Sequence, residues 1–351
     1  MSKNRPNVTS RDVAKRAGVS QASVSRAFTP GGIISDAKKA RILAAADELK
    51  YVPNSIASSL ITARTNTVAL IIGDTGNPFY VHVLRAFIGA LQKRGQQVLT
   101  FTIDTGSTTD DAIRRVLQYR VDAVILTAAQ VSTSMLALCQ EQAIPIILFN
   151  RYIPGESVPV VRCDNAAGGR IMADVLRGAG ARSFALLKGD PRGTTSADRA
   201  QGFLDRLFES GIKQDAVEQI ECGSTYDGAR QAVERVYVEQ GRALPDAVFG
   251  VNDVMAMAAI DVLRFALSKS IPDDIMVAGF DSIPESARAP YQLTTLLQPI
   301  DTMVADTLAL LDESLAAGDV AAFSAEKIIP SQLIWRKTVP GVEPRLTDTL
   351  P

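Results

Sequence analysis

Short apolar runs alternate with amphipathic helical patterns over most of this chain, and no other feature of the sequence limits its fold so strongly. The first apolar runs lie at residues 68–73, 97–102, 122–127 and 144–150. Helical patterns begin between them at Phe79, Thr109 and Ser132. Strand-length runs separated by helices in this way predict a parallel sheet with helices on both faces.

The alternation resumes after Asp164 and predicts a second, similar α/β lobe. Its apolar runs lie at 183–189, 246–251 and 275–281, with helical patterns that begin at Ala166, Ser196, Tyr226 and Val254. We expect the chain to cross between the lobes near Asp164, Leu297 and Glu326, before a closing strand at 332–338. The first lobe then comprises residues 66–164 and 297–325, the second comprises 165–296 and 326–338, and residues 339–351 form a flexible tail.

A different pattern precedes Val68. Two very short helical patterns surround Gly18 in the stretch VTSRDVAKRAGVSQASVSRAF, residues 8–28. Thr9 with Asp12 is typical of a helix start, and Ser20 can cap the second helix. Isolated helices this short are marginal in water, so they must pack together or against a partner. Two such helices joined by A-G-V-S predict a helix-turn-helix.

A third helix completes an all-α head over residues 1–53. Ser35 can cap it, and helical spacing places on one face Ile42, Leu43, Ala46 and Leu49. In the second helix Val24, Ala27 and Phe28 face inward. Its outward residues are Gln21, Ala22, Ser25 and Arg26. We therefore expect a second helix that is narrow enough to enter a DNA major groove.

The distribution of charge is consistent with a polyanionic partner for the front of the chain alone. Residues 1–65 hold eleven lysines and arginines against four acidic residues, a net charge of +7, whereas the whole chain has a net charge of −1. A solvated basic face would give the same count, so the geometry of the head must decide. There, Gln21 and Arg26 can bond to adenine and guanine edges, while lysines and hydroxyl groups bind phosphates.

Residues 54–65 connect the head to the first lobe. Pro53 ends the third helix, Asn54 can cap another, and a short helical pattern follows that includes Ala57 and Leu60. Taken alone, this segment is an interdomain linker in which Leu60 packs on a neighbouring residue.

Polar and aromatic residues follow the apolar runs, where ligands bind in doubly wound sheets. The polar ones are Asp74, Asn77, Asp104, Asn150, Arg151, Asn252, Asp253 and Asp281. The aromatic ones beside them are Phe79, Tyr80, Phe149, Tyr152 and Phe280. Any single Asp or Asn here could simply cap the next helix. Their convergence predicts a site for a small hydroxylated ligand, because polar groups bind hydroxyls and rings stack on apolar sugar faces.

Several classes of protein are disfavoured by the composition. Cys139, Cys163 and Cys222 have no ligand-like spacing, so we expect no disulfide framework, no metal and no cofactor. The first residues lack an apolar signal region and the apolar runs are strand-length, so we expect a cytoplasmic protein without a membrane span. The only histidine is His82, and neither G-x-S-x-G nor a phosphate-binding glycine motif occurs, which argues against an enzyme.

The stretch VTSRDVAKRAGVSQASVSRAF, followed by ELKYVPNSIASSL, resembles the DNA-binding head of the lactose-repressor (LacI/GalR) family of bacterial transcription regulators. The resemblance implies that residues 54–65 form a hinge helix that pairs with its dimer mate in the minor groove and wedges a leucine between base steps. Leu60 and Ala57 occupy the matching positions. The expected DNA contacts are Thr9, Ser20, Gln21, Ala22, Ser25, Arg26, Thr29, Ser35, Asn54, Ala57 and Leu60.

The long remainder resembles the same family's periplasmic-binding-protein-like effector domain. The matching motifs are N-P-F-Y at 77–80, V-x-x-D-N at 161–165, R-x-x-G-F at 199–203, V-N-D at 251–253, G-F-D at 279–281 and L-T-T-L-x-Q at 293–298. They imply effector contacts from Arg199, Asn252, Asp281 and Gln298, with Asn150 and Tyr226. The full expected set is Asn77, Phe79, Asp104, Asn150, Arg151, Arg199, Tyr226, Asn252, Asp281 and Gln298.

Two departures from the family pattern bear on the ligand. Asn150 stands where the lactose repressor carries an aspartate, and Tyr226 stands in place of its stacking tryptophan. They argue against a lactose-like ligand and are compatible with another sugar. Arg151 and Arg199 leave a sugar acid or a sugar phosphate open, because a guanidinium grips carboxylates and phosphates bidentately.

The expected function is that of an effector-responsive repressor that binds a near-palindromic operator. A homodimer is expected because two heads must reach two half-sites, and the tail after Thr338 has no leucine heptad for further assembly. The alternative is a cytoplasmic sugar-binding or sugar-processing α/β protein in which the head is incidental. A transport receptor would share the two lobes, but the attached basic head argues against it.

Overall fold

The computed structural model describes residues 8–28, 32–52, 65–73, 76–103, 106–127, 131–317 and 323–341. Contacts divide the chain into two compact units that separate between Asn66 and Thr67. The first unit contains the three helices of the head, and the second contains both α/β lobes. Among the helices of these ranges, none has the length and apolarity that a membrane span requires.

The head consists of α1 (Ser10–Ala17), α2 (Gln21–Phe28) and α3 (Asp36–Glu48). The Asp12 carboxylate accepts hydrogen bonds from the backbone N–H and the hydroxyl of Thr9, which fixes the start of α1. Gly18 ends α1 in a left-handed conformation with a φ of +62°. This is the helix-turn-helix that the sequence predicts.

The three helices share a small core. Val13, Val24 and Ile42 are buried in it, together with alanines from all three helices. Leu43 is predicted to join this core, but it is 42% exposed. It follows Ile42 directly, and one residue turns the side chain by about 100° around a helix, which directs Leu43 away from the core.

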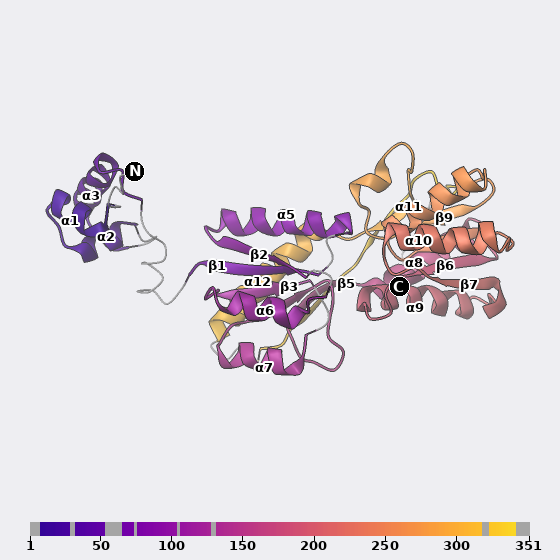
Figure 1. Ribbon diagram of the computed structural model, residues 1–351, viewed down its shortest axis with the longest axis horizontal. Helices are drawn as coiled ribbons and strands as arrows, with labels where there is room; N and C mark the ends of the chain where they lie inside the picture. Colours follow the sequence, from indigo (N-terminus) through magenta and orange to yellow (C-terminus); the bar gives the residue numbers. More distant parts are fainter. Residues whose placement is uncertain are drawn as a thin grey trace, which may run out of the picture. The chain divides into compact units, whose positions relative to one another are not determined.

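The first lobe is built on six parallel strands in the order β11-β5-β4-β3-β1-β2. They are β1 (Thr67–Ile72), β2 (Gln97–Thr102), β3 (Ala123–Leu126), β4 (Ile146–Phe149), β5 (Val160–Cys163) and β11 (Glu326–Ile329). Helices α5 (Pro78–Lys93) and α12 (Ile300–Ala317) cover one face, and α6 (Thr109–Leu117) and α7 (Thr133–Glu141) cover the other (Figure 1).

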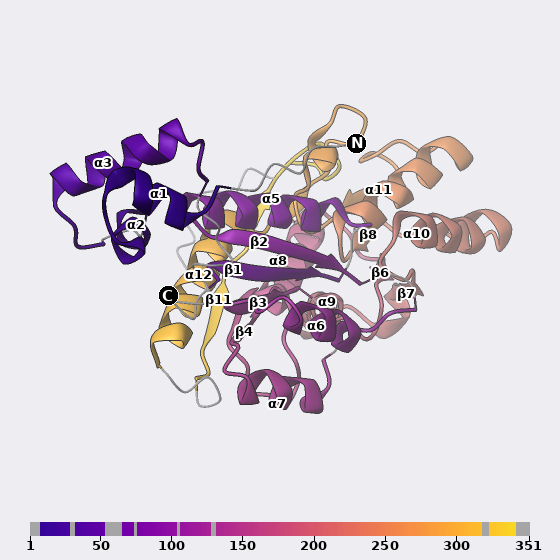
Figure 2. The same ribbon diagram turned by 60° about the vertical axis from the view of Figure 1, so that its left-hand side comes forward.

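Side chains alternate between the two faces along each strand. In β1, Val68 and Leu70 pack in the core beneath α5, whereas Ala69 and Ile71 pack in the core with α6. Figure 2 shows α5 lying along β1 and β2. Because these strands are buried on both faces, their sequences are continuous apolar runs.

The second lobe has four parallel strands in the order β7-β6-β8-β9. They are β6 (Phe184–Lys188), β7 (Val217–Glu221), β8 (Ala247–Gly250) and β9 (Met276–Ala278). On one face α8 (Asn165–Gly178) packs against α9 (Thr194–Glu209), and on the other α10 (Tyr226–Val233) packs against α11 (Asp253–Asp261). Short helical turns occupy Gln214–Ala216, Glu234–Glu239, Val262–Ala266 and Pro284–Ala287.

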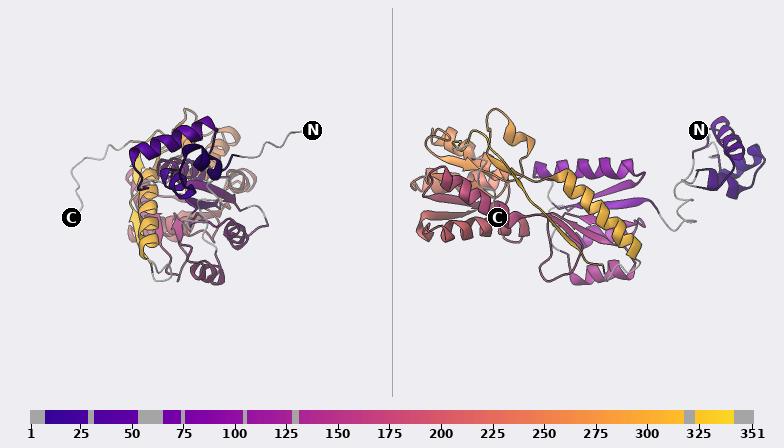
Figure 3. Two further views of the ribbon diagram at one scale, coloured as in Figure 1. Left: turned by 90° about the vertical axis from the view of Figure 1, so that its left-hand side faces the viewer. Right: turned by 180° about the vertical axis from the view of Figure 1, so that it is seen from behind.

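Three segments join the lobes. The chain leaves the first lobe after β5, returns through β10 (Thr295–Leu297) into α12, and leaves again after β11. The last crossing, expected near Glu326, comes instead after Ile329, because β11 pairs with β5 in the first sheet. The chain then reaches β12 (Gln332–Ile334), which pairs antiparallel with β10. The yellow segment in Figure 3 follows this path from one lobe to the other.

Candidate functional site

A cavity of about 250 Å³ lies between the two lobes of the second unit. The first lobe contributes residues that follow β1 and β4, and the second contributes residues that follow β6, β7, β8 and β9. The expected residues that line it are Asn77, Phe79, Asn150, Arg151, Arg199, Asn252 and Asp281. The carboxyl ends of the strands thus converge here, as the doubly wound arrangement requires.

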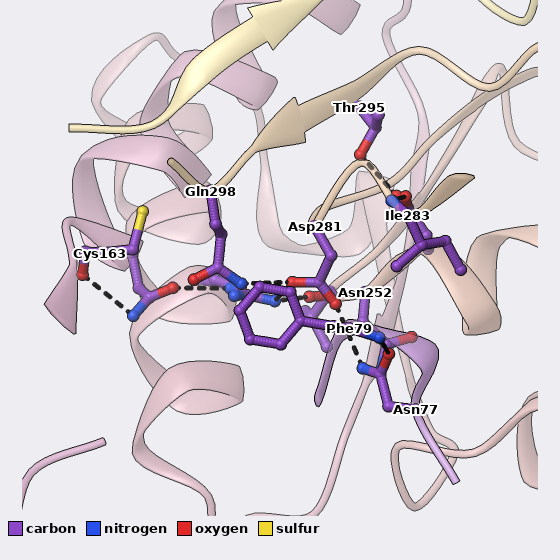
Figure 4. A network of polar contacts seen from close by, with 12 residues as sticks. Asn77, Phe79, Cys163, Asn252, Asp281, Ile283, Thr295 and Gln298 are labelled. Atoms are coloured by element: carbon purple, nitrogen blue, oxygen red, sulfur yellow. Dashed lines mark hydrogen bonds and ion pairs between the residues drawn. The ribbon is translucent and has the colours of Figure 1, made fainter. Parts of the chain in front are cut away.

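Asp281 is the centre of a buried polar network at this cavity (Figure 4). The carboxylate is only 4% exposed. Its Oδ1 lies 3.0 Å from Arg199 Nη1 and accepts a hydrogen bond of 2.7 Å from Gln298 Nε2, while Oδ2 accepts one of 3.2 Å from Asn77 Nδ2. Burial raises the pKa of Asp281, and the Arg199 charge and the three donors oppose that rise.

Arg199 is held by contacts on every side. It projects from α9, its Nε donates to Asn165 Oδ1 over 2.8 Å, and its Nη1 donates to the Val251 carbonyl over 2.7 Å. The guanidinium carbon lies 3.7 Å from the centre of the Phe280 ring. In the described part of the chain these contacts use Nε and Nη1 and do not engage Nη2.

The asparagines in the cavity show that capping a helix and lining a site are compatible. Asn77 Oδ1 accepts from the Phe79 N–H at the start of α5, and Asn252 Oδ1 accepts from the Met255 N–H at the start of α11. Asn150 caps no helix, and its buried Oδ1 has no hydrogen-bond partner among the described residues. A buried acceptor of this kind is satisfied when a ligand hydroxyl donates to it.

Arg151 Nε donates a hydrogen bond of 3.2 Å to the Tyr80 hydroxyl, and its guanidinium also lies over the Tyr80 ring. Asp190, which also lines the cavity, is paired with Arg192 on the rim. Hydrogen bonds from Arg192 lower the pKa of Asp190, and the nearby charge of Arg151 acts in the same direction. The cavity therefore presents charged groups of both signs.

Two of the expected effector residues that the structure describes, Tyr226 and Gln298, are not among the residues that line this cavity. The Tyr226 hydroxyl donates to Asp261 over 2.6 Å, and Tyr291 donates to the same carboxylate, so this ring is part of the lobe's structure. Gln298 donates to Asp281 and lines a neighbouring groove, which shares Phe79 and Asp281 with the cavity. Asp104 lies outside the described residues, as does Asp74.

The cavity also includes polar residues outside the expected set of effector contacts. These are Asp190, Thr195, Ser196, Ser224 and Thr225. Asp190 closely follows β6, so the rule that locates Asn150 and Asn252 would have located it as well. Ser224 and Thr225 follow β7, which the apolar pattern does not predict.

The head presents the expected side chains of α2 outward. Gln21, Ala22, Ser25 and Arg26 are exposed, and Gln21 Nε2 donates to Ser10 Oγ over 2.9 Å. Ser20 Oγ accepts from the Ser23 N–H at the start of α2, while Thr9 and Ser35 stand exposed before α1 and α3. The remaining expected DNA contacts lie outside the described residues: Thr29, Asn54, Ala57 and Leu60.

Comparison with known proteins agrees with this architecture for both the head and the lobes. Residues 65–310 match the family described as periplasmic binding proteins and sugar binding domain of the LacI family, and residues 9–54 match bacterial regulatory proteins of the lacI family. The ribose operon repressor of Halalkalibacterium halodurans is 32% identical over 339 residues, which cover 95% of this chain and 98% of that protein. The regulator CelR of Thermobifida fusca is 30% identical over 306 residues, 85% and 89% of the two chains.

Solved structures show the same fold. The complex of the transcriptional regulator CelR with cellobiose matches with a TM-score of 0.68 and 28% identity, over 95% of this chain and all 100% of that one. The lac repressor dimer bound to operator and the anti-inducer ONPF matches with a TM-score of 0.83 and 21% identity, over 95% and 99%, which supports the fold alone. With both parts of the chain matched in order, and with a relative 32% identical over 95% of it, the chain belongs to the LacI family of bacterial regulatory proteins.

Proposed function

We propose that this protein is an effector-responsive transcriptional repressor that binds a near-palindromic operator as a homodimer and binds a sugar-like effector between its lobes without transforming it. The observation that carries the proposal is the polar cavity around Asp281 and Arg199, in the same chain as a head with an exposed helix α2. The relatives named as a ribose operon repressor and as a cellobiose complex support a sugar-like ligand.

The proposed DNA contacts follow from the head. Gln21 and Arg26 read base edges from α2, and hydroxyl groups such as those of Ser25 and Ser35 bind phosphates. Leu60 and Ala57 act in the minor groove, as the resemblance to the family's hinge helix implies. A dimer supports this arrangement because the two half-sites of a palindrome are related by the same two-fold symmetry.

Selection of binding sites from random double-stranded DNA with the full-length protein tests the first half of the proposal. The selected sites should be near-palindromic. Arg26→Ala should then lose about 1–3 kcal/mol of binding to the selected site and less to random DNA, because it loses a base contact. Arg41→Ala removes the same charge from the exposed side of α3. It should weaken binding to the selected site and to random DNA by the same amount. Equal losses on both DNAs for Arg26→Ala would reassign this residue to a phosphate.

A thermal-shift screen tests the second half. D-ribose, cellobiose, D-galacturonate, ribose 5-phosphate and adenosine represent a neutral sugar, a disaccharide, a sugar acid, a sugar phosphate and a nucleoside. A ligand that binds the folded state alone raises the unfolding temperature. The ligand should not raise the unfolding temperature of Asp281→Ala. An equal rise in the wild type and in Asp281→Ala would contradict the proposed site.

A further inference from the structure

The turn that carries Asp281 has an unusual backbone. Asp281 has a φ of +116° and Ser282 a φ of +52°, so two consecutive residues other than glycine lie at positive φ. Such conformations are unfavourable for residues other than glycine and persist only where the surrounding structure imposes them. Something must therefore hold this turn in place.

Asp253 makes contacts on both sides of the turn. Its backbone N–H donates to the Phe280 carbonyl over 2.7 Å, and its Oδ2 accepts from the Ile283 N–H over 2.8 Å. Its Oδ1 accepts from the Thr295 hydroxyl on β10. Figure 4 shows Thr295 and Ile283 next to each other beside the Asp281 network.

The close approach of Asp253 depends on a glycine. A Cβ on Gly279 would lie 2.4 Å from Asp253 Oδ1, so only glycine leaves room for the carboxyl at this point. Asp253 itself is fully buried and is not among the residues that line the cavity. A ligand between the lobes therefore does not touch it.

A second contact reaches the turn from the chain that follows β12. Arg336 Nη2 donates to Ser282 Oγ over 3.1 Å, and its Nη1 donates to the Leu293 carbonyl over 2.7 Å. The turn is thus held by α11 through Asp253 and by the chain that follows β12 through Arg336.

We propose that Asp253 is a positioning residue for effector binding, which holds the left-handed turn so that the Asp281 carboxylate faces Arg199 and the cavity. This rests on the proposed function in one respect, that the effector contacts Asp281. Asp253 acts through the backbone of residues 280–283 and not through the ligand.

The first test needs no effector. A crystal structure of Asp253→Ala should show Asp281 outside the left-handed region and its 3.0 Å contact with Arg199 lost. An unchanged turn would overturn the proposal. If Asp253→Ala does not fold, Asp253→Asn compared with the wild type at pH 8 gives the same readout. At that pH the wild-type carboxylate accepts from both donors, whereas asparagine has the same size but supplies one acceptor oxygen.

The second test is calorimetry with D-ribose and with cellobiose. Asp253→Ala should bind the sugar about tenfold more weakly or worse, with full stoichiometry of the folded protein. Adding Ser282→Gly should recover part of this loss, because glycine adopts positive φ at little cost. The matched double variant with Ser282→Ala loses the same hydroxyl but keeps a Cβ, so it should recover nothing.

The outcomes separate this proposal from the proposed function. If Asp281→Ala binds as wild type does, the site itself is wrong. If Asp281→Ala loses binding while Asp253→Ala keeps the wild-type dissociation constant and only unfolds at lower temperature, Asp253 is structural and the positioning role is wrong. If neither sugar binds the wild type, the crystal structure decides.

Discussion

At the scale of single residues, the same Asp253 gives the protein a dependence on pH. Burial raises the pKa of this carboxyl to about 7, the negative charge of Asp281 adds to the rise, and hydrogen bonds from Thr295, the Ile283 N–H and Ser286 oppose it. Arg336 is the cation that faces it. The group thus titrates well above the pKa near 3.9 that an aspartate has in an unfolded chain.

The sign of the effect follows from proton binding. Between about pH 4 and pH 7 the folded chain holds the Asp253 proton and the unfolded chain does not, so this group makes folding less favourable as the pH rises through that window. Asp253→Asn should abolish this contribution. Compared with the variant, the wild type should lose up to about 1.4 kcal/mol of unfolding free energy for each pH unit between pH 5 and pH 7. Urea unfolding at pH 5, 6, 7 and 8 measures it, and a difference that stays constant with pH would contradict the shift.

Arg151 should determine whether the cavity prefers an anionic effector over a neutral one. A guanidinium in a partly buried site binds a carboxylate or phosphate bidentately, whereas a neutral sugar offers it no charge. We expect Arg151→Ala to weaken the binding of a sugar acid or a sugar phosphate by about 1.5–3 kcal/mol. The affinity for a neutral sugar should change little. Tyr80→Phe is the matched control, because it removes the hydroxyl that Arg151 contacts and leaves the charge. Equal losses for both ligand types in Arg151→Ala would exclude a charge-specific role.

At the scale of elements, the crossing of α8 and α9 places Arg199. The helices approach so closely that a Cβ on Gly202 would lie 2.1 Å from the Ala166 carbonyl, and a Cβ on Gly169 would lie 2.2 Å from the carbonyl of Arg199 itself. Both contacts are to backbone, which cannot move without moving a helix. The position of the arginine is thus set by two glycines.

Gly202→Ala should therefore destabilise the protein by about 1–3 kcal/mol through overpacking, and it should also weaken effector binding because α9 shifts. Gly178→Ala, at the end of α8 with open space around its Cα, is the control and should be neutral or stabilising by up to about 1 kcal/mol. Chemical denaturation and calorimetry give the two quantities. A Gly202→Ala variant as stable as the control would show that the helices separate at no cost.

Which strands could be predicted from the sequence depends on how deeply each strand is buried. β1, β3, β4 and β8 are buried along almost their whole length and appear as unbroken apolar runs, so their positions are predictable. β7 buries only Val217 and Ile220 of its five residues, and β11 begins with two charged residues. Edge strands of this kind resemble loops in composition, which is why the last crossing is misplaced and Ser224 is not predicted. Motif matching placed Tyr226 and Gln298 in sequence but could not give the direction of their side chains.

At the scale of the whole molecule, the two units differ in charge. Residues 1–65 carry a net charge of +7 in a chain whose total is −1, so the remainder carries −8. We therefore expect the affinity for DNA that comes from phosphate contacts to originate mainly in residues 1–65, because the remainder of the chain is acidic overall. Any influence of the effector on DNA binding has to be transmitted along the chain as a coupling free energy between two sites.

Such coupling is reciprocal, and this gives the decisive prediction for the protein as a regulator. If a saturating effector changes the operator dissociation constant by some factor, saturating operator DNA must change the effector dissociation constant by the same factor, typically about 5- to 150-fold. Fluorescence anisotropy with labelled operator gives the first factor, and calorimetry with and without operator gives the second. A sugar whose binding is lost in Asp281→Ala, but whose affinity in the wild type is the same with and without operator, would mean that the cavity binds sugars without regulating DNA. The head and the lobes would then be independent modules, which is the alternative that the sequence leaves open.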